Sequence, residues 1–250
     1  MKSIVTCLHQ DFAGARTYFE QYGFGVEIQR FLEIDIHADE IIAEYNTALP
    51  VQMPKYMHAP FWDLCLGSSN KMIADVTRKY FDFSYDVGLK FGCEGIIVHH
   101  GFVPNTTPPD LWINNAAKFF HDFFMAHPEP MTVYMENQLE RSPQIMMDVI
   151  DAVSDTRLMV NLDVGHVHAF SDVPAVSWIE QLGSRIGYVH LHNNFGSLDE
   201  HNALDNGSLD MASVLAALES HAPDAIWSLE FGLDRLPQSI AYLQSLGYVK

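Results

Sequence analysis

The sequence predicts an α/β protein folded as a single (β/α)8 TIM barrel that spans residues 1–250. Three observations favour this fold: eight β-rich runs alternate with helical stretches, no linker or break in composition divides the chain, and 250 residues suit one barrel. A doubly wound open sheet is the alternative, but it usually needs fewer units. No GxGxxG or Walker-type loop follows the first run, which disfavours the nucleotide-binding form of that sheet.

The predicted strands are short runs rich in β-branched, aromatic and other apolar residues. Such side chains favour strands because they pack well on a pleated surface. In a barrel of parallel strands, the ends of these runs and the loops that follow them form the mouth where function lies. The runs lie at residues 3–10, 25–30, 55–60, 95–101, 132–137, 158–166, 187–194 and 226–232.

The stretches between these runs have apolar residues at the spacing typical of amphipathic helices. Several begin with Pro beside Ser or Asp, as in PPDLW and SPQIM, which is a helix-start signal. Examples of the predicted helices lie at residues 13–22, 70–90, 110–126, 143–153, 174–182, 210–220 and 236–246.

The charge of the chain restricts its partners. It has 32 acidic and 14 basic residues, a net charge of −18. Such a field repels phosphate backbones and anionic membranes, so it argues against duplex DNA and accommodates a neutral or cationic partner more easily. Acidic surfaces also serve solubility alone, so the charge by itself does not identify the substrate.

The sequence also predicts a cytoplasmic location. No apolar run reaches membrane-spanning length, and the first residues, MKSIVTCLHQ, are typical of a strand and not of a signal peptide. The three cysteines, Cys7, Cys65 and Cys93, lie far apart and form no CxxC pair, which favours a reducing compartment.

Residues that can bind a metal gather at the ends of six consecutive predicted strands. One histidine at a strand end is more often a hydrogen-bonded core residue, but six strands with such residues at one mouth indicate a site. Burying so many imidazoles and carboxylates together is costly without a cation, and mixed ligands suit Zn²⁺ or Mn²⁺. Adjacent His99 and His100 cannot share a strand face, whereas His190 and His192 can. The set comprises His58, His99, His100, Glu136, Asp163, His166, His190, His192, Asp199, His201 and Glu230.

These segments resemble the xylose isomerase-like TIM-barrel superfamily. It contains sugar phosphate isomerases and 3-epimerases, inosose dehydratases, and endonuclease IV-like enzymes of AP endonuclease family 2. The resemblance runs from YGFGVEIQ to SLEFG, which is most of the chain. Each motif alone is weak, but their order and spacing are specific. The motifs are MHAPFWDL, IIVHHG, YMENQ, NLDVGH, RIGYVHLHNNFGSLDEHNALDNG and WSLEF.

The resemblance implies a metal site with one to three divalent ions, Zn²⁺ or Mn²⁺. The four ligands common to the superfamily fall by motif on Glu136, Asp163, His190 and Glu230. Endonuclease-like members add a second metal, matched by His58 and His99, and a third, matched by His166, Asp199 and His201. However, the endonuclease pattern has His-Pro-Gly where residues 99–101 are His-His-Gly, and Gly-Glu-Gly where residues 205–207 are Asp-Asn-Gly.

The implied activity is isomerisation or epimerisation of a small sugar or sugar derivative. Glu136 and Glu230 are the expected catalytic residues, one removing a proton beside a metal-bound carbonyl and the other returning it. We expect substrate contacts from His166, His192, Trp62 and Asn137. The aromatic residues Phe61 and Trp112 are stacking candidates that packing would explain equally well.

Three other functions stay open from the sequence. A multi-zinc phosphoesterase of endonuclease IV type would use the second and third sites, although basic DNA-binding loops are missing. An inosose-type dehydratase would begin with the same proton abstraction. A barrel that only binds a ligand would not need two glutamates at the metal. Exposed barrel helices often pair, so a homo-oligomer is also open.

Overall fold

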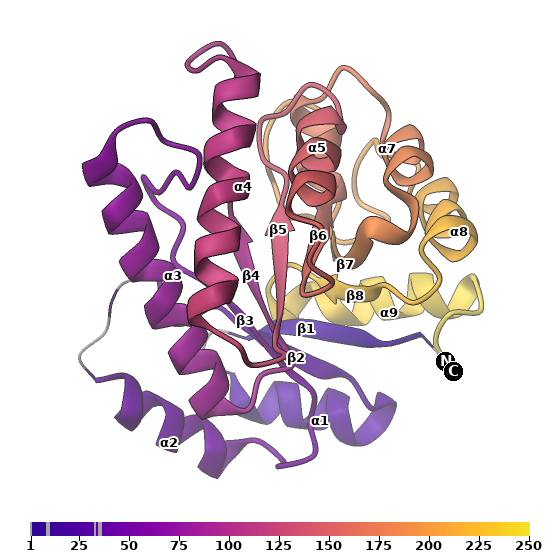
Figure 1. Cartoon of the computed structure of the whole chain (residues 1–250). Coiled ribbons are helices and arrows are strands. Elements are labelled where there is room, and N and C mark those ends of the chain that lie inside the picture. Colours follow the sequence, from indigo (N-terminus) through magenta and orange to yellow (C-terminus); the bar gives the residue numbers. More distant parts are fainter. Residues whose placement is uncertain (1, 9–10, 33, 35–36) are drawn as a thin grey trace.

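Eight parallel strands close into one barrel in the computed structural model, which describes residues 2–8, 11–32, 34 and 37–250. Each strand pairs with the next one along the chain, and the last pairs with the first, which confirms the predicted (β/α)8 fold. Figure 1 shows the strands at the centre and the helices around them. The strands are β1 (Ile4–Leu8), β2 (Gly25–Ile28), β3 (Lys55–His58), β4 (Gly95–His99), β5 (Thr132–Glu136), β6 (Leu158–Asp163), β7 (Ile186–Leu191) and β8 (Ile226–Leu229).

The helices bury apolar faces against the outside of the barrel. The seven predicted helices whose bounds are given above agree with the structure to within one residue at each end. Their apolar spacing and their helix-start signals indicate the same bounds. No described helix is long and apolar enough to span a bilayer. The α-helices are α1 (Phe12–Tyr22), α2 (Ala38–Ala48), α3 (Lys71–Phe91), α4 (Pro109–Ala126), α5 (Gln144–Val153), α6 (Val164–Phe170), α7 (Ala175–Leu182), α8 (Met211–His221) and α9 (Leu236–Ser245), and short 3₁₀ turns lie at Gly183–Arg185 and Leu233–Arg235.

The prediction of a strand over 158–166 is wrong at its end. β6 stops at Asp163 and α6 begins at Val164. The Asp163 carboxylate accepts the backbone N–H of His166 at 2.7 Å, so it caps the first turn of α6 and ends the strand at the same point. His166 therefore lies on a helix and not at the end of a strand.

Six other predicted strands also end one to three residues beyond the observed ones, and the strand predicted over 95–101 is an example. β4 stops at His99, and Gly101 has a φ of +71°, which is a turn conformation that favours glycine. A Cβ atom there would lie 2.0 Å from the carbonyl oxygen of Leu64, so the loop can approach only because position 101 has no side chain. Residues 9 and 10, the end of the first predicted strand, lie outside the described residues.

A buried layer of large side chains fills the barrel below its mouth. The rings of Tyr56 and Tyr134 lie 5.2 and 5.0 Å from that of Tyr188, with Val5 and Ile97 packed beside them. Side chains two apart on a strand point to the same face. The same alternation that points Tyr188 into the barrel therefore points His190 inward, one layer closer to the mouth.

Candidate metal centre

Four side chains from four neighbouring strands meet at the carboxyl end of the barrel. We call Glu136, Asp163, His190 and Glu230 the central cluster. The Nδ1 atom of His190 lies 3.3 Å from Glu136 Oε2, 3.7 Å from Asp163 Oδ2 and 3.1 Å from Glu230 Oε2. All four residues are buried. Since each follows or ends a parallel strand, the barrel itself brings them together.

The central cluster fits a divalent cation. Three carboxylates converge on one imidazole nitrogen, and such buried charge needs compensation. His190 Nδ1 and Glu230 Oε2 are buried atoms without a hydrogen-bond partner among the described residues. Burial opposes the charge on Glu136, but His190 and His99 outweigh it and keep the pKa of this carboxyl well below its ordinary value. A mixed set of oxygen and nitrogen donors suits Zn²⁺ or Mn²⁺.

Glu27, on β2, holds the far side of the His190 ring. Its Oε2 atom lies 3.0 Å from His190 Nε2 and accepts hydrogen bonds from Tyr188 (2.9 Å) and Ser228 (2.8 Å), while Gln29 donates to Oε1 at 3.0 Å. Burial opposes the charge on Glu27, but His190 lowers its pKa to about 2. In the neutral ring the ionised carboxylate keeps the proton on Nε2, which leaves Nδ1 as the nitrogen available to a metal in the central cluster.

Sequence reasoning missed Glu27. The available signal was the alternation of side chains along the strand. Val26 and Ile28 pack in the core outside the barrel, so Glu27 between them must point inward. A carboxylate at an inward position of a buried parallel strand needs a cation or several donors. Its place in the motif YGFGVEIQ gave no indication of its partner.

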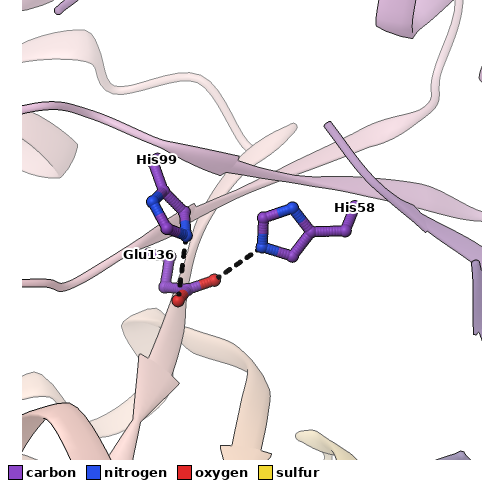
Figure 2. A group of neighbouring side chains, drawn as sticks. All are labelled: His58, His99 and Glu136. Carbon is purple, nitrogen blue, oxygen red and sulfur yellow. Dashed lines mark ion pairs between the residues drawn. The ribbon is translucent and has the colours of Figure 1, made fainter. Parts of the chain in front are cut away.

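A second group shares Glu136 with the central cluster. We call His58, His99 and Glu136 the side cluster, and Figure 2 shows both rings turned towards the carboxylate. His58 Nε2 lies 3.5 Å from Glu136 Oε2, and His99 Nε2 lies 3.3 Å from Oε1. The Nδ1 atom of His58 lies 2.8 Å from its neighbour's carbonyl oxygen, at Ala59. The spacing of these donor atoms is close enough for one ion.

A third group, the outer cluster, consists of His166, Asp199 and His201. The Asp199 Oδ2 atom lies 3.2 Å from His166 Nε2 and 2.9 Å from His201 Nε2. The Nδ1 atom of each histidine lies against a backbone carbonyl oxygen. His166 Nδ1 lies 2.9 Å from that of Asn137, and His201 Nδ1 lies 2.8 Å from that of Glu230. Burial opposes charge on His201, but the hydrogen bond to Asp199 outweighs it and raises the pKa to about 9. The outer cluster is more exposed than the central one.

Two histidines and an amide that the sequence groups with the site lie outside the three clusters. The prediction that His99 and His100 diverge is confirmed, because His100 is fully buried and its Nε2 atom faces Glu140. Asn137 exchanges two hydrogen bonds with the backbone of Asp163, at 3.0 and 2.8 Å, and is buried. His192 is also fully buried, and its Nε2 atom lies 3.1 Å from Asp163 Oδ1. Both residues therefore support Asp163 and neither is among the residues that line the cavity above the clusters, so their contacts with a substrate stay predictions.

A cavity of about 580 Å³ opens above the clusters. Apolar side chains form part of its wall, including Phe61 and Trp62, and Trp62 is 61% exposed at its edge. Trp112 is not among the lining residues; it packs in the core, 1% exposed. Among the described residues, the lining includes no lysine or arginine. The polar lining residues are Gln29, His58, Asp63, His99, Glu136, Gln138, His166, Asp199, His201 and Glu230.

Comparison with known proteins gives a family match and several structures of the same fold. The family described as xylose isomerase-like TIM barrel matches residues 29–246. The uncharacterized protein MJ1311 of Methanocaldococcus jannaschii is 23% identical over 81% of this chain and 77% of its own. A D-tagatose 3-epimerase-like protein has a TM-score of 0.79 and 19% identity, covering 98% of this chain and 96% of its own.

Two further structures have the same fold. The TTHB071 protein of Thermus thermophilus, from a crystal soaked with ZnCl₂, has a TM-score of 0.77 and 22% identity, covering 98% of each chain. An AP endonuclease of family 2 from Brucella melitensis has a TM-score of 0.71 and 17% identity, covering 98% of this chain and 99% of its own. At these identities the likeness establishes the fold alone.

Proposed function

The chain belongs to the family of xylose isomerase-like TIM barrels, and from this premise we propose that it is a divalent-metal-dependent isomerase or epimerase of a small sugar or sugar derivative. One observation carries the proposal. Glu136 and Glu230 approach the same nitrogen, His190 Nδ1, at 3.3 and 3.1 Å from two different strands, at the floor of a cavity large enough for a sugar.

The two glutamates are suited to moving a proton. One carboxylate takes the proton from the carbon beside the carbonyl, and the other glutamate, in its acid form, returns a proton to the same or the neighbouring carbon. Asn161 donates to Glu136 Oε2 at 2.9 Å and Gln29 donates to Glu230 Oε1 at 3.0 Å, which orients both carboxylates. The divalent ion, when bound, supplies Lewis-acid stabilisation of the negative charge that forms next to the carbonyl.

The lining of the cavity favours an uncharged substrate. Several carboxylates line it, and none of the described lining residues is a lysine or arginine. A phosphate held away from the metal would meet negative charge without a basic partner. Trp62 and Phe61, whose ring centroids lie 5.4 Å apart, offer apolar faces against which a sugar ring can stack. We therefore propose a sugar or glycoside without phosphate as the substrate.

The test is exchange with solvent of the proton on the carbon beside the carbonyl. Wild-type protein loaded with Mn²⁺ or Zn²⁺ is incubated with neutral ketoses in D₂O, and deuterium incorporation and isomer formation are followed by NMR. Glu136→Gln and Glu230→Gln should abolish exchange, whereas Glu180→Gln, on the exposed side of α7, should not. Metal content is measured on each variant. Full turnover in a Gln variant that still binds metal would exclude the proposed roles.

A multi-zinc phosphoesterase of endonuclease IV type is the second candidate. The outer cluster favours it, because Asp199 Oδ2 lies within 3.2 Å of the Nε2 atoms of both His166 and His201 and so joins two imidazoles to one carboxylate. Two or more ions would generate a hydroxide and bind a phosphodiester. Hydrolysis of a small phosphodiester by zinc-loaded protein, without isomerase activity, would support it.

An inosose-type dehydratase would share the proton abstraction, and loss of water from the product distinguishes it.

A further inference from the structure

Gln138 links the side cluster to the loop after β4. Its backbone N–H donates to Glu140 Oε2 at 2.6 Å, and Glu140 Oε1 contacts Nε2 of the buried His100 ring. His100 Nδ1 accepts the N–H of Phe102 at 2.9 Å, which directs its other nitrogen to the carboxylate. This buried chain fixes the backbone of Gln138. It also gives a structural role to His100, at the position where the endonuclease pattern has proline.

The orientation of the Gln138 side-chain amide is set by a backbone donor. The N–H of Gly101 points at Gln138 Oε1 at 3.2 Å, and an N–H can only donate. Gly101 cannot move away easily, because its loop lies against the carbonyl of Leu64. With the oxygen held on that side, the amide nitrogen faces His99 Nδ1 at 2.7 Å.

The amide nitrogen determines where His99 carries its proton. An amide NH₂ group only donates, so His99 Nδ1 must accept, and the neutral ring carries its hydrogen on Nε2. That nitrogen faces Glu136 Oε1 at 3.3 Å (Figure 2). A metal ligand needs a bare nitrogen. In this tautomer His99 offers Glu136 a hydrogen-bond donor.

The other histidines of the side and outer clusters have the opposite arrangement. His58, His166 and His201 each place Nδ1 against a backbone carbonyl, which can only accept, so in the neutral ring Nδ1 carries the hydrogen and Nε2 is the nitrogen available to a metal. The carbonyls belong to Ala59 (2.8 Å), Asn137 (2.9 Å) and Glu230 (2.8 Å). His99 differs from these three in the partner of its Nδ1 atom.

We propose that Gln138 is a positioning residue that keeps His99 out of metal coordination and holds it as a hydrogen-bond donor to Glu136. The side cluster then lacks one of its three ligands and does not retain an ion. The inference rests on the metal-dependent function proposed above, since it concerns how many of the same residues bind metal. It limits the catalytic centre to the central cluster and leaves Glu136 Oε1 free of metal on the side of His99.

Metal counting tests the proposal without an assay of activity. Wild type, His99→Ala, Gln138→Glu and the double variant are equilibrated with Zn²⁺, dialysed and analysed for zinc per chain. A carboxylate at 138 accepts from Nδ1, which moves the hydrogen of the His99 ring and bares Nε2. We expect equal zinc in wild type and His99→Ala, one additional ion in Gln138→Glu, and loss of that ion in the double variant. Gln181→Glu, at an exposed position of α7, is the matched control and should not change the number of zinc ions per chain.

Two results would overturn the inference. If His99→Ala alone loses one ion per chain, His99 is already a ligand. If Gln138→Glu gains none, the tautomer is not what excludes the ion. Long-range ¹H–¹⁵N spectra of metal-free wild type supply a second measurement that does not depend on any variant at 138. We expect the signal that disappears in His99→Ala to have its hydrogen on Nε2, and a hydrogen on Nδ1 would contradict the proposal.

These readouts separate the two proposals. Absence of isomerase activity with the expected zinc counts and tautomer would overturn the function and leave the role of Gln138 intact. Isomerase activity together with a zinc ion lost in His99→Ala would overturn the role of Gln138 alone.

Discussion

The central and outer clusters use the same kinds of side chain, but different elements of secondary structure carry them. The residues of the central cluster lie at or next to the ends of parallel strands, are buried, and are supported from behind by Glu27. The outer cluster takes one histidine from the first turn of α6 and two residues from the loop after β7. The side chains of Asp199 and His201 are 29% and 31% exposed. The barrel backbone therefore preorganises the side chains of the central cluster, whereas the outer cluster is held mainly by its own hydrogen bonds.

Replacing Asp163 should have the largest effect, because it removes a central ligand. Asp163→Asn keeps an oxygen that can cap α6 but removes a charge from the central cluster. We expect loss of tightly bound metal and a fall in turnover of about a thousandfold. Elemental analysis and steady-state rates check this. Asp199→Asn should leave the central ion in place, and metal retained in Asp163→Asn at wild-type affinity would remove the distinction between the clusters.

Replacing Glu27 should weaken metal binding without removing a ligand. In Glu27→Gln the partner of His190 Nε2 is neutral, so the ring is a weaker donor and is less firmly oriented. We expect the dissociation constant for Zn²⁺ to rise about 10- to 100-fold. Competition with a chelating dye measures it, and Glu27→Asp should recover part of the loss. The outer cluster, which uses backbone carbonyls in the same role, should bind as before; an unchanged affinity of the central site would show that its support comes from elsewhere.

The outer cluster should make the metal-free protein sensitive to alkaline pH. Since the folded pKa of His201 is raised from 6.5 to about 9, its stabilisation is fully present below 6.5 and is lost as pH rises through about 9. Allowing for solvent screening, we expect a loss of about 1–2 kcal/mol in the free energy of unfolding. Urea denaturation with chelator at pH 6 and pH 9.5 measures it. His201→Asn tolerates the φ of +48° at this position and should flatten the dependence.

The smallest effect is expected at the edge of the cavity. Trp62→Ala removes an exposed ring that can stack on a sugar but contacts no cluster, so KM should rise about fivefold with kcat nearly unchanged. Met125→Ala, an exposed position on α4, should change neither parameter. A fall in kcat comparable to that of the Glu136 variant would mean that the cavity wall and the central cluster do not act separately.

The barrel was predictable because its strands are short apolar runs that end in a polar residue. TVYME and LMVNLD each have this form, so both the strand and its polar end residue, Glu136 or Asp163, could be recognised. The end of β6 could not, because VGHVHAF continues the apolar pattern while Asp163 caps a helix. The residues of the central cluster were predictable as a group. The number of ions that they bind and the role of each residue stay predictions.

Interactions between distant residues set the remaining details of the site. Glu27 meets His190 across 163 positions of sequence, and no local pattern encodes that contact. Gln138 and His99 likewise meet only because β4 and β5 are neighbours. Asn137 lies beside a ligand in the chain, which made it a candidate for substrate binding, but its side chain turns to the backbone of Asp163. Adjacency in sequence does not fix the direction of a side chain at the end of a strand.

The tyrosine layer around Tyr188 has a kinetic consequence under the proposed function. It fills the barrel beneath the central cluster, so reactant and product must enter and leave through the same mouth. Isomers have equal mass and similar shape, and the cavity has little means of favouring release of one over entry of the other. Product should therefore inhibit competitively, with a constant close to the KM of the substrate, and net flux should depend on a later reaction that consumes the product.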